Sequence, residues 1–174
     1  AFYRCSSLST IRIPVTTTNL SESIFAYCDN LMQVVIESPI AKLPEWTFYG
    51  CTSLTSVSLP SSIQNIGEYA FHDCDSLQTV SLPDSLKMMG GRAFKSCESL
   101  KSIVIPNGVK VIETETFQYC YALSSVKLPS GLEKILSAIA DMRNKGSDSH
   151  GVGAKRITIA DHHARLFVNS AMTT

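Results

Sequence analysis

The stretch "AFHDCDSLQTVSLP", residues 70–83, contains one Phe, one Cys and a Leu-x-x-Val-x-Leu-Pro run. The same frame recurs upstream at residues 47–60 as "TFYGCTSLTSVSLP" and downstream at residues 93–106 as "AFKSCESLKSIVIP", which defines a 23-residue period. Self-similarity at a fixed short period is typical of proteins that stack one structural unit on the next. The stretch is therefore one unit of a repeat and not an isolated site.

Six copies of this unit keep the same residue type at five positions of the 23-residue period. The aromatic and sulfur positions are Phe2, Phe25, Phe48, Phe71, Phe94 and Phe117, and Cys5, Cys28, Cys51, Cys74, Cys97 and Cys120. The aliphatic positions are Leu8, Leu31, Leu54, Leu77, Leu100 and Leu123, followed by two branched or leucine residues three and five positions later. Stacked units would place like residues in ladders.

Each unit predicts one short strand, because apolar residues such as Val80 and Leu82 alternate with polar ones. Proline ends this strand in five copies, since it has no N–H for the next rung, and Glu37 replaces it in the second copy. A second apolar pair, such as Ile63 and Ile66, indicates a return segment, and "EYAF" then suggests a brief helical turn. Such a unit cannot bury its apolar side alone, so its neighbours must cover it.

The unit L-x-x-V-x-L-P followed by A-F-x-x-C resembles the BspA-type leucine-rich repeats of bacterial surface proteins and some protist families. The resemblance covers residues 1–135. It implies a leucine-rich-repeat solenoid with a parallel β-sheet on the concave face and short return segments and helical turns on the other side. It also implies a protein-binding or adhesion role without a shared catalytic residue, at the cell surface or after secretion.

Two regions follow from the repeat pattern. Residues 1–135 are expected to form six 23-residue repeats, and residues 136–174 a degenerate last coil or C-terminal cap, with a loop insertion near residues 143–153. In that coil Ile157 should take the place that Val126 has in the sixth copy. The chain opens inside a repeat, so we expect further repeats upstream.

Composition excludes several partners. The 15 basic residues balance the 15 acidic ones, so no overall field attracts nucleic acid. No apolar run approaches the roughly 18 to 20 residues that a membrane helix needs, so we expect no membrane insertion.

The six cysteines are expected to be buried free thiols. Stacked coils would place successive cysteines about 5 Å apart, within disulfide range, but side chains in a ladder point the same way and not toward each other. Close pairs such as C-x-x-C are absent from the sequence, which argues against a zinc site. We expect no metal and no cofactor.

Catalysis has one weak candidate, the string Asp161, His162 and His163, which resembles one motif of the DHH phosphoesterases. Their other motifs cannot be found in the sequence, and the string suits an exposed turn of a cap. We therefore expect no catalytic residue and no enzyme. A structural spacer or self-associating repeat segment remains as an alternative to the binding module.

The strand residues between the ladder positions should face outward, and they include no acid, since the acids are expected on turns and on the return side. Two interpretations stay open: a merely solvated strand face, or a flat surface for an acidic protein or extracellular-matrix ligand. The candidate partner-binding residues are Arg12, Met32, Val35, Ser58, Ser81, Lys101, Val104, Lys127, Lys155 and Arg156.

Overall fold

The computed structural model describes residues 2–129 and 158–159. We number the repeats as coils 1 to 6, which begin at residues 1, 24, 47, 70, 93 and 116. The strands are β1 (Thr10–Ile13), β2 (Gln33–Ile36), β3 (Lys42–Leu43), β4 (Ser56–Ser58), β5 (Asn65–Ile66), β6 (Met88–Met89), β7 (Ser102–Val104), β8 (Ser125–Lys127) and β9 (Thr158–Ile159). All of their recorded pairings are parallel.

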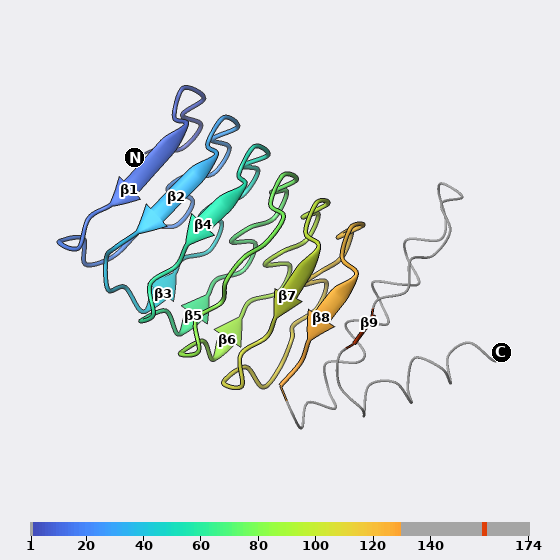
Figure 1. The fold of residues 1–174 in the computed structure, drawn as a ribbon. Coiled ribbons are helices and arrows are strands. Elements are labelled where there is room, and N and C mark those ends of the chain that lie inside the picture. The colour runs from blue at the N-terminus through green and yellow to red at the C-terminus, as the bar shows by residue number, and fades with distance from the viewer. Residues whose placement is uncertain (1, 130–157, 160–174) are drawn as a thin grey trace, which may run out of the picture.

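Three small sheets build the stack. The sheets β1–β2–β4 and β7–β8–β9 contain the predicted repeat strands, and β3–β5–β6 contains the return segments. In the first sheet Ile11 pairs with Val34 and Val34 with Val57, so each rung is the same position of the next repeat. Figure 1 shows the coils stacked in chain order, with the return strands along a separate edge. The predicted parallel solenoid is confirmed.

Coil 4 departs from the expectation of one repeat strand per unit. Thr79 forms only an isolated bridge to Ser102, and coil 4 has no repeat strand between β4 of coil 3 and β7 of coil 5. Coil 4 is joined to coil 3 instead on the return side, where Asn65 pairs with Met88. A strand needs a paired neighbouring strand as well as alternating residues. Between coils 3 and 4 the backbone hydrogen bonds lie outside the repeat-strand positions.

The pairing of β9 differs from the expected register by two residues. Ile159 pairs with Val126, where the sequence pattern placed Ile157. A shift of two keeps the alternation between the two faces of a strand, so both registers satisfy the same apolar pattern. The predicted boundaries of the cap and its loop insertion lie in residues that the structure does not describe, apart from this strand.

The core consists of the predicted ladders. Phe25, Phe48 and Phe71 are at most 1% exposed. Adjacent phenylalanine rings stack with centroids 5.5 Å apart between coils 2 and 3 and 5.4 Å apart between coils 3 and 4. Offset stacking of this kind adds to the stabilisation from burial. The inner coils thus bury their apolar sides against their neighbours, whereas Phe2 of coil 1 is 39% exposed.

The turn side of the stack, which carries the Ala-Phe element, contains no helix in the described residues, so the helical-turn prediction is wrong. In each of coils 1 to 5 two residues adopt left-handed backbone angles; Trp46 of coil 2, with φ 60°, and Tyr69 of coil 3, with φ 56°, are examples. Such residues interrupt a right-handed helix. Their N–H groups donate to the following coil instead, as from Trp46 to the Glu68 carbonyl at 3.0 Å.

The same pattern repeats along the turn side. In coils 1 and 2, the N–H groups of Ser23, Phe25 and Tyr27 donate to the carbonyls of Glu45, Thr47 and Tyr49. These bonds satisfy backbone groups next to the buried ladders, where unpaired polar groups would be costly.

Candidate binding face

The strand face is the outer surface formed by the alternate residues of the repeat strands and the residue before each strand. Eight of the ten predicted partner-binding residues are described, and all are exposed except Val35, which is half-buried. In register, Arg12 pairs with Val35 and Val35 with Ser58, so these three form one row across coils 1 to 3. Lys155 and Arg156 lie outside the described residues.

Two apolar side chains stand out on this face. Met32 is 47% exposed and Val104 is 57% exposed. Between them the face carries small polar side chains, including Ser58 and Ser81, which are also exposed. Small side chains leave the sheet accessible to a partner that lies flat on it, while Met32 and Val104 supply apolar contact area.

The charge on the face is less uniformly basic than the sequence suggested. Arg12 donates to the carboxylate of Glu37, which follows β2 at the position that proline occupies in the other copies. Acids are therefore not confined to the turns and the return side. Lys101 donates through Nζ to Oε1 of Gln78 at 3.1 Å, a neutral partner, so its positive charge is not paired there.

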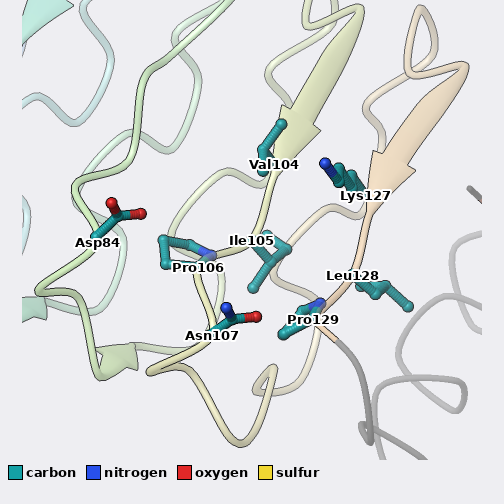
Figure 2. Close-up of a pocket in the computed structure, with 8 residues that line it drawn as sticks. All are labelled: Asp84, Val104, Ile105, Pro106, Asn107, Lys127, Leu128 and Pro129. Carbon is teal, nitrogen blue, oxygen red and sulfur yellow. The ribbon is translucent and has the colours of Figure 1, made fainter. Parts of the chain in front are cut away.

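A pocket at the end of the face was not predicted. It is lined by Asp84 from coil 4, by Val104, Ile105, Pro106 and Asn107 from coil 5, and by Lys127, Leu128 and Pro129 from coil 6. Figure 2 shows Val104 and Lys127 at the ends of neighbouring strands, with Asp84 on the coil beside them. Asp84 and Lys127 belong to coils 4 and 6, so no local motif could indicate that they line one pocket.

The thiols of the cysteine ladder have low reactivity. All six cysteines are free, four of them buried. Burial raises the pKa of the Cys51 thiol to about 12 and raises the pKa of Cys74 well above its usual value. A thiol is reactive as its thiolate, so these groups are poor nucleophiles at neutral pH. Among the described residues no group of three His, Cys, Asp or Glu side chains is placed to hold a metal ion.

The histidine that the structure describes next to an acid is His72. Its Nδ1 lies 2.9 Å from Oδ1 of Asp73, and its ring stacks on Tyr49 with centroids 4.9 Å apart. Burial lowers the pKa of His72, against the opposing effect of Asp73. The string Asp161 to His163 lies outside the described residues, and within them no helix has the length and apolar character to cross a membrane.

Sequence reasoning also missed a column of residues on the turn side, which we call the turn column. Its members are the last residues of coils 1 to 5, namely Ser23, Trp46, Tyr69, Arg92 and Glu115. Trp46 stacks on Tyr69 with ring centroids 4.1 Å apart and an interplanar angle of 13°. The guanidinium of Arg92 lies 5.4 Å from the Tyr69 ring centroid.

At its far end the turn column is closed by an acid. Glu115 Oε2 accepts from Arg92 Nε at 2.9 Å and from Lys95 Nζ at 2.7 Å. These two bonds lower the pKa of Glu115 to about 2. The residue types differ along the column, so no repeated letter in the sequence marks it; the only signal is the 23-residue spacing itself.

Comparison with known families agrees with the repeat pattern. The profile of the BspA type leucine rich repeat region, with six copies, matches residues 1–97 and 47–141. No curated protein matches the chain.

Three solved structures are similar. A leucine-rich repeat protein from Bacteroides ovatus is 40% identical over 76% of this chain and 34% of its own, with a TM-score of 0.71. The T. pallidum leucine rich repeat protein is 33% identical over 71% of this chain and 60% of its own, with a TM-score of 0.69. A leucine rich cell surface protein from Faecalibacterium prausnitzii is 32% identical over 70% of this chain and 36% of its own, with a TM-score of 0.62.

The chain thus spans less than two thirds of the length of each of these three proteins. With its ladders, its parallel rungs and this profile match, the chain belongs to the BspA-type leucine-rich repeat family.

Proposed function

We propose that the chain is a non-catalytic binding module that presents its strand face to a protein or extracellular-matrix ligand. The observation that carries the proposal is the exposed strand face, on which Met32 and Val104, 47% and 57% exposed, stand among small polar side chains. Exposed apolar side chains on the solvent side of the sheet supply contact area that a partner can bury. A role in adhesion at a cell surface draws support from the F. prausnitzii relative, which is described as a cell surface protein.

The favoured partner carries acidic groups. Lys101 and Lys127 are exposed on the face, and of the face cations only Arg12 forms an ion pair with an acid among the described residues. Complementary charge steers association and favours one partner over another. The pocket beside Val104 would receive an apolar side chain of the partner, with Lys127 at its rim to bind an adjacent carboxylate.

A direct test uses a labelled peptide of alternating Asp and Val residues as the probe, titrated by fluorescence anisotropy at several salt concentrations. Lys101→Glu should weaken binding about three- to tenfold at low salt, and the loss should shrink as salt screens the charges. Val104→Ser should weaken binding at every salt concentration, because it removes apolar contact.

Lys87→Glu is the matched control. Lys87 is also exposed and also donates through Nζ to a glutamine of the preceding coil, Gln64, at 3.0 Å, but it lies on the return side. It should leave the titration nearly unchanged. Equal losses for Lys87→Glu and Lys101→Glu would show a general charge effect, and no loss for either would remove electrostatics from the proposal.

A further inference from the structure

The turn column is a series of contacts whose last aromatic ring, Trp46, has ring partners in coil 3 but no ring or cation from coil 1 among the described residues. From coil 5 to coil 2 the series runs as an ion pair, a guanidinium over a ring, and a stacked pair of rings. In coil 1 the column residue is Ser23, whose side chain is too short to cover an indole. The two recorded ring partners of Trp46, Tyr49 and Tyr69, both belong to coil 3.

The turn side of this chain repeatedly binds its own cations on aromatic rings. The guanidinium of Arg4 lies 5.3 Å from the Tyr3 centroid and 5.2 Å from the Tyr27 centroid. Lys95 Nζ lies 5.4 Å from the Tyr119 centroid. Tryptophan is the best of the aromatic residues for such contacts, yet Trp46 has no cation of this chain over it in the part of the chain that the structure describes.

Trp46 is half-buried, and acidic residues lie next to it and to Ser23 in the sequence. Glu22 and Glu45 directly precede Ser23 and Trp46, and Glu22 is exposed. Glu45 is partly engaged by Lys42 at 3.8 Å and keeps 40% of its side chain exposed. The position therefore offers an aromatic ring and, on neighbouring residues, carboxylates, which are the two kinds of group that hold Arg92 at the other end of the column.

We propose that Trp46, Glu22 and Glu45 form a binding site for an arginine side chain of a basic partner segment, which lies over Ser23 on the turn side. The incoming guanidinium takes the place on Trp46 that Arg92 takes on Tyr69, and Glu45 acts as Glu115 does. This site is separate from the strand face and takes the opposite charge, so one stack can hold an acidic and a basic partner on different sides.

Trp46 is the only tryptophan of the chain, so its indole N–H gives one resonance in a nitrogen–proton correlation spectrum. The probe is an acetyl-Gly-Arg-Gly-amide peptide, and the matched control peptide carries citrulline, which has the same shape without the charge. The arginine peptide should move the indole resonance in a saturable way. An equal shift with the citrulline peptide would overturn the proposal.

Two variants locate the site. Ser23→Tyr should abolish the arginine shift by completing the column, and the substitution is tolerable because Tyr69 has nearly the same left-handed φ, 56° against 55°. Glu45→Gln, on the surface, should weaken binding about three- to tenfold. An unchanged titration in both variants would overturn the assignment.

A third variant separates this site from the strand face. Lys101→Glu should leave the arginine titration unchanged, because that residue lies on the strand face. Loss of binding in Lys101→Glu would place the arginine site elsewhere than on Trp46.

Discussion

The thiol of Cys74 donates a hydrogen bond to the backbone carbonyl of Phe48, with 3.2 Å between Sγ and the oxygen. The same bond recurs at five cysteines, each reaching the phenylalanine 26 residues earlier. The Phe48 carbonyl also accepts from the N–H of Cys51 at 3.1 Å. Cysteine thus serves the repeat as a small apolar residue with a donor that ties one coil to the coil before it.

Thiol reactivity should follow position in the ladder. Cys5 and Cys120 are half-buried and the other four are buried. Without reductant, a thiol reagent should label these two slowly in the folded protein and all six after denaturation. Fewer than six labelled thiols in the denatured protein would show disulfides and contradict the free ladder.

Stability should fall in alkaline solution because of the buried thiols. The pKa of Cys51 is about 12 in the folded protein against an ordinary value of 9.0. A raised folded pKa means that this contribution to stability is complete below pH 9.0 and is lost as the pH rises toward 12. Each such thiol lowers the free energy of unfolding by up to about 1.4 kcal/mol per pH unit in that window.

Urea unfolding from pH 8 to pH 10.5 checks this effect, with Cys51→Ala as the comparison. The variant should be less stable than the original chain at pH 8, and the gap should narrow above pH 9. If the free energy of unfolding changed equally with pH in both proteins, the Cys51 thiol would not be a cause of the alkaline loss of stability.

Acid should weaken the ion cluster at Glu115. Its pKa is about 2 in the folded protein against an ordinary 4.5, because Arg92 and then Lys95 donate to it. A depressed folded pKa means that the stabilisation is present above pH 4.5 and is lost as the pH falls toward 2. Because the cluster is partly exposed, Glu115→Gln should cost only about 0.5–1 kcal/mol at pH 7 and clearly less at pH 2. Thermal unfolding at both pH values measures this cost. An equal cost at pH 2 would mean that the substitution acts through packing and not through the lost charge.

The phenylalanine stack should dominate stability over the strand face. Phe71→Ala removes a fully buried ring between Phe48 and Phe94 and should cost roughly 3–5 kcal/mol. Ser58→Ala, on an exposed strand position, should change the free energy of unfolding by less than about 0.5 kcal/mol. Denaturant titration of both variants compares them, and equal costs would refute the assignment of inner and outer positions.

Two glycines should respond oppositely to alanine. A Cβ on Gly67 would lie 2.5 Å from the backbone N of Glu45, whereas one on Gly91 would be 3.5 Å from the nearest atom. Gly67→Ala must push two coils apart and should cost about 1–3 kcal/mol. Gly91→Ala should be neutral or slightly stabilising, because it restricts the unfolded chain. Melting temperatures that shift alike would mean that the coils separate easily at Gly67.

The ladders could be predicted because burial imposes the same residue type on every coil. Phe71, Cys74 and Val80 therefore identify the inner side of the unit by spacing alone. The conformation of the turn could not be predicted, since Trp46 and Tyr69 adopt left-handed angles that their side chains do not favour. The bonds from their N–H groups to the next coil hold those angles, and such bonds appear only when the coils are placed together.

The candidate binding face could also be predicted only in part from the sequence. The exposure of Val104 followed from strand alternation, but the ion pair of Arg12 with Glu37 did not. The pocket near Asp84 and the stacking of Trp46 on Tyr69 join residues of different types from different coils. A repeat pattern predicts what its copies share, and binding sites arise where the copies differ.

The turn-side backbone also gives the stack a direction. In the peptide unit that joins Glu45 to Trp46, the carbonyl accepts from Ser23 at 3.1 Å and the N–H donates to Glu68 at 3.0 Å. Each such unit carries a dipole of about 3.5 D, and in rows that all point the same way the dipoles add as they do in an α-helix. The turn side therefore carries a macrodipole along the axis of the stack, negative at coil 1 and positive toward coil 6, in a chain whose formal net charge is zero.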